Sequence, residues 1–462
     1  MPFKPLRKAQ RVNPSLRHAS ESPLSQSAAA DLDAIYAKIA KRIIPFLACL
    51  FVMAWLDRYN VGFAKLQMVK DLGFSEAVYG FGAGIVYLGY MLFEVPSNLL
   101  LEKIGARKTF ARITILWGIT SITMILVKTP AWFYILRFLL GSFEAGLLPG
   151  VVLYLTYWFP SSRRALMLGL FFTSVPITGI FGNPISGWIM ASMGNRMGLA
   201  NWQWLFLLEG IPSIVVGLLA LAVIIDRPGD ARWLTATEKR LLYADLNEDH
   251  QHFGRRKHSL TEGLRSARVW VLAVTFFCLI STNVTLPFWI PTIIQSLGVK
   301  NAISNGLLSA VPYIFGLIAI VLVGRHSDHA QERRYHSALP CLGCAISLVS
   351  IGVFAHIPAV AFLALVLAQA CASGAAPPFW QIPSMLLTGT AAAAGIALIN
   401  SVGNLSGWLG PSVVGWLKDA TGTTATGLYV VAGLEVLAAL LILRFAARRE
   451  VALTGPYQSN PL

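Results

Sequence analysis

The chain has 462 residues, of which 55% are hydrophobic and only 13% are charged, and its mean hydropathy is +0.62. These values exclude an ordinary soluble globular protein, in which about 25% of residues are charged. The net charge of +15 does not indicate a nucleic-acid partner, because most of the basic residues lie in tails and loops on one predicted side of a membrane.

Apolar runs of about 20 residues, each long enough to cross the ~30 Å hydrocarbon core of a bilayer, recur along the chain. Their length and continuity favour α-helices over the short alternating strands of a membrane barrel. The sequence therefore predicts an all-α integral membrane protein with 12 transmembrane helices, at 43–64, 79–101, 110–127, 132–156, 165–190, 204–225, 270–291, 305–324, 337–355, 359–388, 391–417 and 426–446.

The longest polar segment, 226–268, separates the sixth predicted span from the seventh, and its residues 234–238 (LTATE) predict a capped helix. Residues 1–36 are basic, contain Pro5, Pro14 and Pro23, and lack an apolar signal-peptide core, so we expect a disordered cytoplasmic tail. The predicted units are this tail, an N-terminal six-helix bundle at 37–225, a cytoplasmic linker at 226–268, a C-terminal six-helix bundle at 269–447 and a cytoplasmic tail at 448–462.

The two halves repeat one another. The segment 98–108 (NLLLEKIGARK) follows the second span and aligns with 324–334 (GRHSDHAQERR), which follows the eighth. The segment 182–188 (GNPISGW) aligns with 410–416 (GPSVVGW) at nearly the same offset along the chain. Two matches at nearly one offset predict parallel, pseudo-symmetric halves, with a binding site near the bilayer midplane between two bundles.

Charged residues lie inside two predicted spans: Asp57 and Arg58 in the first, and Arg137 and Glu144 in the fourth. A charge at the bilayer centre costs roughly 2.5–3.5 kcal/mol even on mild insertion scales, so such residues are paired or line a polar cavity. Arginine can hold a carboxylate through two hydrogen bonds, and a carboxylate can gain or lose a proton as its surroundings change. These charges predict a pathway for an organic anion and protons, although permanent structural salt bridges remain an alternative.

Helical geometry orients these side chains. Glu144 follows Arg137 by seven residues, which places both on one helix face, and Gly141 between them permits close approach of another helix. Asp57 and Arg58 are adjacent and project about 100° apart on an ideal helix, so we expect them to face different neighbours.

Other polar residues in the spans receive weaker assignments. Glu94 and Glu209 are interpreted as structural, and Glu435 is given no role. The pair Cys341 and Cys344 has no second cysteine pair or histidine cluster beside it, so we expect free thiols rather than a metal site.

Both loop repeats resemble the hallmark of the major facilitator superfamily, G-x-x-x-D-[RK]-x-G-[RK]-[RK]. The first copy departs from it at Asn98, Glu102 and Ala106, and the second departs at Gln331. In this family the acid caps a neighbouring helix and the bases pair across the bundle interface. The resemblance implies gating residues, which would otherwise serve only to anchor the topology, at Glu102, Arg107, Lys108, Asp328, Arg333 and Arg334.

Motifs spread over most of the chain resemble the anion:cation symporter family, which includes tartrate, phthalate, hydroxyphenylacetate and sugar-acid permeases of bacteria. These motifs are DRYN at 57–60, FEVPSN at 93–98, RFLLGSFEAG at 137–146, WQWLF at 202–206 and FWIP at 288–291. The stretch from Asp57 to Trp117 is most similar to the tartrate and phthalate permeases.

The resemblance implies a role for individual residues. Arg58 would contact the substrate carboxylate, Arg137 would organise the charge network of the cavity, and Asp57 and Glu144 would couple protons. The remaining implied substrate-binding residues are Tyr90, Trp380 and Asn400. Val175 stands where some sugar-acid transporters have a glutamine, so we expect a compact or aromatic acid rather than a sugar acid.

The sequence therefore predicts a secondary active transporter that imports a small organic anion, such as tartrate or phthalate, by proton symport with alternating access. An anion exchanger, an uncoupled facilitator and a membrane nutrient sensor remain alternatives. No H-E-x-x-H, G-x-S-x-G or G-x-x-x-x-G-K-[ST] motif occurs, so we expect no enzyme activity, cofactor or metal. The expected partners are the anion, protons and the lipid bilayer, and the expected location is the bacterial inner membrane, as a monomer with both termini cytoplasmic.

Overall fold

The computed structural model describes residues 23–194, 196–253, 266–386 and 391–453, and within these ranges it contains helices and no strand. Residues 1–22 and 454–462, which belong to the two predicted tails, lie outside the described residues. The N-terminal half contains α1 (Pro23–Leu72), α2 (Glu76–Ile104), α3 (Ala106–Thr123), the 3-10 turn η2 (Met124–Leu126), α4 (Pro130–Glu144), α5 (Leu147–Thr156), α6 (Ser161–Phe172), α7 (Ser174–Ser192) and α8 (Asn201–Val223). The linker contains α9 (Ala236–Phe253), and the C-terminal half contains α11 (Ala267–Ser296), α12 (Ala302–Ala330), α13 (Arg334–Val353), α14 (Pro358–Leu386), α15 (Ala391–Asn404), α16 (Ser406–Thr421) and α17 (Thr424–Leu453).

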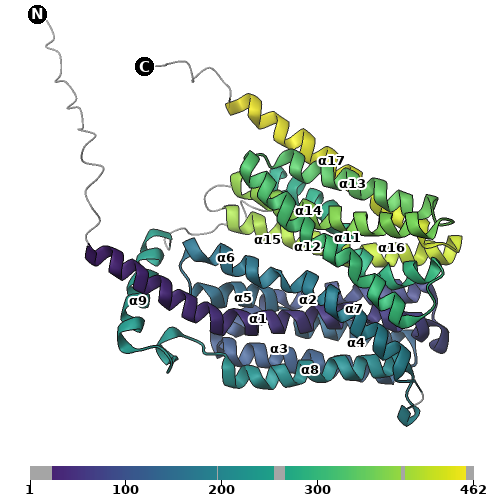
Figure 1. Ribbon diagram of the computed structural model, residues 1–462, viewed down its shortest axis with the longest axis horizontal. Coiled ribbons are helices and arrows are strands. Elements are labelled where there is room, and N and C mark those ends of the chain that lie inside the picture. Colours follow the sequence, from purple (N-terminus) through teal and green to yellow (C-terminus); the bar gives the residue numbers. More distant parts are fainter. Residues whose placement is uncertain (1–22, 195, 254–265, 387–390, 454–462) are drawn as a thin grey trace, which may run out of the picture.

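The helices form two bundles that lie side by side, α1–α8 in one and α11–α17 in the other (Figure 1). Eleven segments of the described residues are long and apolar enough to span a membrane. The predicted span 391–417 is not among them, and it is divided between α15, which ends at Asn404, and α16, which begins at Ser406. Two further predicted spans, 132–156 and 165–190, are each divided into two consecutive helices.

The break in the predicted span 132–156 has a local cause. Gly146 adopts φ +89°, a conformation that L side chains rarely adopt, and a Cβ atom there would lie 2.5 Å from Ser97 Oγ. Helix α4 therefore ends at Glu144, and α5 starts again at Leu147. One of the predicted proton-coupling carboxylates thus lies at a helix terminus.

The second sequence repeat forms the crossings between the bundles. A Cβ atom on Gly80 of α2 would lie 2.3 Å from the carbonyl oxygen of Pro411 in α16. At the repeat-equivalent position in α12, a Cβ atom on Gly306 would lie 2.6 Å from the carbonyl oxygen of Asn183 in α7. Both crossings need glycine because helix backbones meet there, which explains why the two halves share this pattern.

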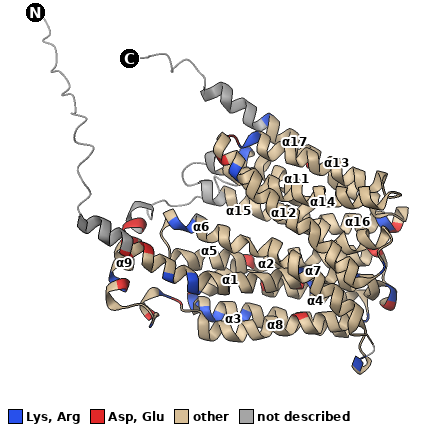
Figure 2. Ribbon diagram, in the orientation of Figure 1, with Lys and Arg blue, Asp and Glu red and all other residues tan. Residues whose placement is uncertain are grey.

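We call the end of the bundles that carries α9 the linker end, and the opposite end, where α1 turns into α2, the far end. Charged residues concentrate at these two ends and are few along the middle (Figure 2). At the linker end α9 contacts α1 through an ion pair between Lys38 and Glu238 of 2.8 Å. The predicted cap is confirmed, since Thr235 and Glu238 each accept the other's backbone N–H. The Lys38 ammonium and the Thr235 N–H hold the pKa of the Glu238 carboxyl below its usual range.

Candidate substrate and proton site

A buried ion pair joins Arg58 of α1 to Glu144 at the end of α4. Arg58 Nη2 lies 2.8 Å from Glu144 Oε1, and Arg58 Nε donates to Oε2 at 2.9 Å. The exposed fractions of the two side chains are only 8% and 4%, so water screens the charges of this pair little. The pair uses both carboxylate oxygens, which is the two-bond geometry that arginine offers to an anion.

Three aromatic rings surround the Arg58 guanidinium. Its central carbon lies 4.9 Å from the ring centre of Trp55 and 5.1 Å from the ring centres of both Tyr87 and Tyr90. Such cation–π contacts stabilise a guanidinium without adding negative charge. The predicted residue Tyr90 is therefore adjacent to Arg58, and Tyr87 completes the surroundings.

Tyrosines also connect this pair to the opposite bundle. The Tyr59 and Tyr313 rings lie 5.7 Å apart, and Tyr313 belongs to α12. A Cβ atom on Gly407 of α16 would lie 2.6 Å from the Tyr87 ring. Tyr87 and Tyr313 are related by the same offset as the two loop repeats, so the repeat alone could have pointed to both.

Asp57 faces away from Arg58, as its position on the helix predicts. Its Oδ1 accepts a hydrogen bond from Ser121 of α3 at 2.7 Å, and its Oδ2 accepts one from Ser213 of α8 at 2.8 Å. Among the described residues it forms no ion pair, although it is 1% exposed. Two hydroxyl donors replace water around this carboxyl group, and neither supplies a countercharge.

Arg137 is fully buried but does not pair with Glu144. Its Nε and Nη2 donate to the carbonyl oxygens of Gly82 and Ala83 of α2, at 3.3 and 3.0 Å. Its Nη1 has no hydrogen-bond partner in the described part of the chain. The predicted close approach beside it is confirmed, because a Cβ atom on Gly141 would lie 1.9 Å from a carbonyl oxygen of α2.

The other predicted cavity residues lie elsewhere. Trp380 packs within the C-terminal bundle, with its ring 4.7 Å from that of Phe276. Asn400 is half-buried on α15, and Val175 packs against the apolar core of the N-terminal bundle near α1 and α5. Among the described residues, neither Asn400 nor Val175 forms a hydrogen bond or an ion pair with Arg58 or Glu144.

A polar cluster that the residue motifs missed lies in the C-terminal bundle. Asn283 donates to the carbonyl oxygen of Ala372 at 2.9 Å and accepts from Gln369 Nε2 at 3.4 Å. Gln369 also donates to Ser373 Oγ at 3.0 Å. Asn283 stands at the repeat-equivalent position of Asp57, so the repeat places a neutral amide where the N-terminal half has an acid.

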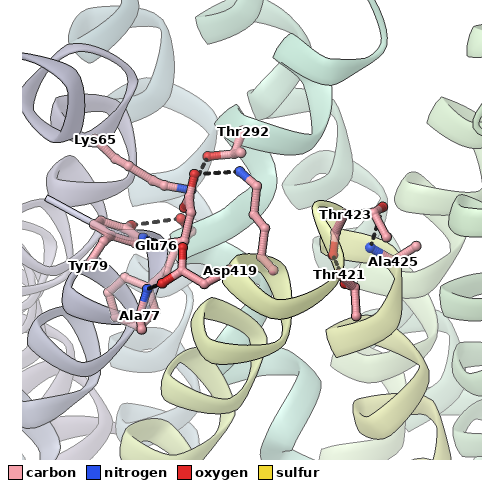
Figure 3. A network of polar contacts seen from close by, with 11 residues as sticks. Lys65, Glu76, Ala77, Tyr79, Thr292, Asp419, Thr421, Thr423 and Ala425 are labelled. Atoms are coloured by element: carbon pink, nitrogen blue, oxygen red, sulfur yellow. Dashed lines mark hydrogen bonds and ion pairs between the residues drawn. The ribbon is translucent and has the colours of Figure 1, made fainter. Parts of the chain in front are cut away.

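A charged network closes the far end between the two bundles (Figure 3). Glu76 at the start of α2 pairs with Lys65 of α1 and with Lys418 of α16, at 2.7 Å each. Lys65 also donates to Thr292 of α11 at 3.1 Å. Asp419 of α16 accepts the backbone N–H groups of Glu76 at 2.9 Å and of Ala77 at 2.7 Å, so the C-terminal bundle caps a helix of the N-terminal bundle.

The predicted gating loops lie at the linker end. Glu102, Arg107 and Lys108 are exposed, and α3 is capped by Asp226, which accepts the Arg107 backbone N–H at 2.9 Å. The first capping acid is thus contributed by the linker rather than by Glu102.

In the second loop Arg333 pairs with Asp328 at 2.6 Å, and Arg334 lies 5.2 Å from the Tyr335 ring centre. Glu332 rather than Asp328 caps α13, by accepting the backbone N–H groups of Tyr335 and His336. Partial burial favours the neutral acid, but these donors hold the pKa of the Glu332 carboxyl below its usual range. The acids that cap α3 and α13 are thus Asp226 and Glu332, and the gating role of Glu102 and Asp328 stays a prediction.

Known proteins resemble this chain over nearly its full length. A protein from Agrobacterium vitis described as "Putative tartrate transporter" is 47% identical over 421 residues, which cover 90% of this chain and 92% of that protein. The Pseudomonas putida "Putative metabolite transport protein NicT" is 43% identical over 415 residues, which cover 90% and 95%. The solved structure of the xylose transporter XylE from E. coli, in a partially occluded inward open conformation, superposes with a TM-score of 0.68 at 15% identity and covers 92% of this chain and 99% of that one.

The family model described as "Major Facilitator Superfamily" matches residues 47–411, which include both halves and the linker. The two-bundle fold, the duplicated halves and the match together confirm the fold and the family expected from the loop motifs. The chain belongs to the major facilitator superfamily and is a multi-pass membrane transporter of small metabolites.

Proposed function

We propose that this transporter imports a small organic anion together with protons, by alternating access. The substrate would be a dicarboxylate, a hydroxy acid or an aromatic carboxylate, such as tartrate or phthalate. The observation that carries the proposal is the buried pair between Arg58 and Glu144 inside a ring of aromatic side chains. The description of a relative that is 47% identical, "Putative tartrate transporter", supports the same class of substrate.

In the proposed mechanism, this pair would link anion binding to protonation. Both carboxylate oxygens of Glu144 bind the Arg58 guanidinium. A substrate carboxylate that binds Arg58 in the same way must therefore displace Glu144. Displacing a charged Glu144 would leave a buried carboxylate without a partner, which is costly. A proton on Glu144 removes that charge, and Arg58 then becomes available to the anion. Proton and substrate are therefore loaded together.

The surroundings of Arg58 favour planar acids. The rings of Trp55, Tyr87 and Tyr90 restrict the approach to the guanidinium and provide flat apolar surfaces beside it. On the opposite bundle, the amides of Asn283 and Gln369 offer hydrogen bonds to hydroxyl groups or to a second carboxylate. A compact acid with two polar ends would be held by both bundles at once.

Alternating access would open the far end by breaking the network around Glu76. Lys65 and Glu76 would remain together on the N-terminal bundle, while Lys418 and Asp419 would move away with α16. We place the protein in the bacterial inner membrane as a monomer, with the linker end and both termini in the cytoplasm. The positive-inside distribution of lysine and arginine supports that orientation.

An anion exchanger is the main alternative, because substrate displacement of Glu144 needs no net proton movement if one anion replaces another. An uncoupled facilitator and a membrane nutrient sensor are further alternatives. Proteoliposome uptake of tartrate, phthalate, hydroxyphenylacetate and sugar acids, with and without an inward proton gradient, separates them. The proposal expects gradient-driven accumulation of at least one carboxylate. Exchange without gradient-driven accumulation would indicate the exchanger, and no transport of any carboxylate would refute the proposal.

A further inference from the structure

A second carboxyl group without a countercharge lies close to Asp57. Glu209 of α8 is 2% exposed, and its Oε1 accepts a hydrogen bond from Ser186 of α7 at 2.6 Å. Its Oε2 is also buried, and no described residue forms a hydrogen bond to it. Glu209 forms no ion pair among the described residues, so nothing there offsets a negative charge on it.

Asn60 lies between the two carboxyl groups. Its Nδ2 is 3.5 Å from Asp57 Oδ1, and its side chain also interacts with Glu209. Asn60 Oδ1 is itself buried without a hydrogen-bond partner in the described residues. A proton held on Glu209 would supply a donor in a pocket that has an excess of acceptors. Among the described residues, Asp57 is the titratable group that interacts with Glu209.

The two acids lie at different heights along the axes of α1 and α8. Ser213, which binds Asp57, follows Glu209 by four residues on α8, so Glu209 lies about 6 Å nearer the far end. Asn60 is likewise about 4.5 Å nearer the far end than Asp57 on α1. From the far end inward, the order is Glu209, Asn60, and then Asp57 beside the pair of Arg58 and Glu144.

We propose that Glu209 is the outer proton-binding site of the transporter, which takes a proton from the far side and passes it to Asp57. In this step one O–H bond on Glu209 breaks and one O–H bond forms on Asp57. Glu209 is then charged and binds the next proton from the far side. The inference rests on the proposed proton symport and adds to it the route by which protons reach Asp57 and Glu144.

The repeat supplies a matched control. Glu435 of α17 stands at the repeat-equivalent position of Glu209 and is similarly buried, with Oε1 accepting from Thr282 at 2.6 Å and Oε2 unpartnered in the described residues. Its neighbours are Cys341 and Cys344, and it has no second carboxyl group beside it among the residues described. Position in the repeat and burial are therefore shared, and only Glu209 has an acid to which it can pass a proton.

The test compares Glu209→Gln, Glu209→Asp and Glu435→Gln in proteoliposomes. Two rates are measured for the carboxylate that the wild type accumulates: uptake driven by an inward proton gradient, and counterflow at equal pH on both sides. Proton entry is followed with a trapped pH-sensitive dye. Glu209→Gln should lower gradient-driven uptake and proton entry by about tenfold or more and leave counterflow near the wild-type rate, since an amide cannot carry a proton. Glu209→Asp should restore uptake, and Glu435→Gln should change neither rate.

Each contrary outcome has a distinct meaning. Gradient-driven uptake retained by Glu209→Gln overturns the inference but leaves proton symport intact. Equal loss of uptake and counterflow in Glu209→Gln, with the same loss in Glu209→Asp, shows a structural role and also overturns it. A wild type that exchanges carboxylates without proton entry refutes the proposed symport, and the inference with it. If Glu209→Gln does not fold, the same two rates are measured for Glu209→Asp and Asn60→Ala. Loss of gradient-driven uptake with counterflow retained supports the inference, and equal loss of both rates overturns it.

Discussion

Removal of the Asp419 side chain should release the far end of the transporter. Asp419 caps α2 across the bundle interface through two hydrogen bonds, of 2.9 and 2.7 Å, to backbone N–H groups. When the bundles separate, water replaces these bonds, so Asp419→Ala destabilises only the state in which the far end is closed. We therefore expect Asp419→Ala to shift the population toward the state in which the far end is open.

The size of the shift follows from the exposure of the contact. Asp419 is exposed and lies at a helix N-terminus, where replacing an acidic cap by alanine costs typically ~1 kcal/mol. The cap from Ser75 to Val78 stays in place, so the loss does not include unfolding of the first turn of α2. A difference of ~1 kcal/mol changes the ratio of the two states about fivefold.

Spin labels at the far end measure this ratio. Cysteines placed at the exposed positions Lys128, before α4, and Lys300, before α12, report the separation of the two bundles by double electron–electron resonance. The five native cysteines are replaced first. The ratio of long to short distances should rise about fivefold in Asp419→Ala relative to the parent chain.

Thr421→Ala is the matched control. Thr421 lies two residues after Asp419 (Figure 3), but among the described residues its hydroxyl forms hydrogen bonds to Leu417, Thr423 and Thr426, all in its own bundle. The distance distribution should therefore stay unchanged in this variant. An unchanged distribution in Asp419→Ala, or an equal change in both variants, would refute the reasoning that the cap stabilises closure.

Three further changes test the site and the helix break. Glu144→Gln should abolish accumulation driven by a proton gradient but retain substrate exchange, because the amide cannot take up a proton; proteoliposome uptake and counterflow check this, and equal loss of both would favour a structural role. Arg58→Lys should weaken binding of the transported carboxylate by about tenfold or more in a titration, because lysine is a point charge without the planar fork, and near-normal affinity would count against Arg58 as the ligand. Gly146→Ala should destabilise the protein by about 1–3 kcal/mol, since its φ of +89° disfavours a side chain and Ser97 would clash with it. The control Gly433→Ala, where a Cβ atom meets nothing within 4 Å, should leave the melting temperature near that of the parent, and an equal drop in both would contradict the strain at Gly146.

Hydropathy and periodicity accounted for the features that depend on neighbours along the chain. The apolar runs indicated the spans, and the adjacency of Asp57 and Arg58 correctly predicted that they face different helices. The glycine at 141 correctly indicated a close helix approach. These features follow from the geometry of one helix, which the order of residues determines directly.

Hydropathy and periodicity did not locate the breaks within spans or the acids that cap short helix ends. Three predicted spans are divided, because an apolar run does not reveal where the backbone must turn. The capping acids of α3 and α13 are Asp226 and Glu332, since a cap is selected by its reach to free N–H groups and not by its place in a motif.

The sequence by itself determined a duplicated membrane bundle with arginines and acids inside it. A charge within a membrane span is costly, so it faces the bundle interior wherever it occurs. Only the tertiary structure decided the partners. Arg58 of α1 pairs with Glu144 of α4, while Arg137, on the same helix as Glu144, donates to the backbone of α2. Helical spacing determines the direction in which a side chain points, but its partner depends on which helix packs there, and that is settled by the packing of the whole bundle.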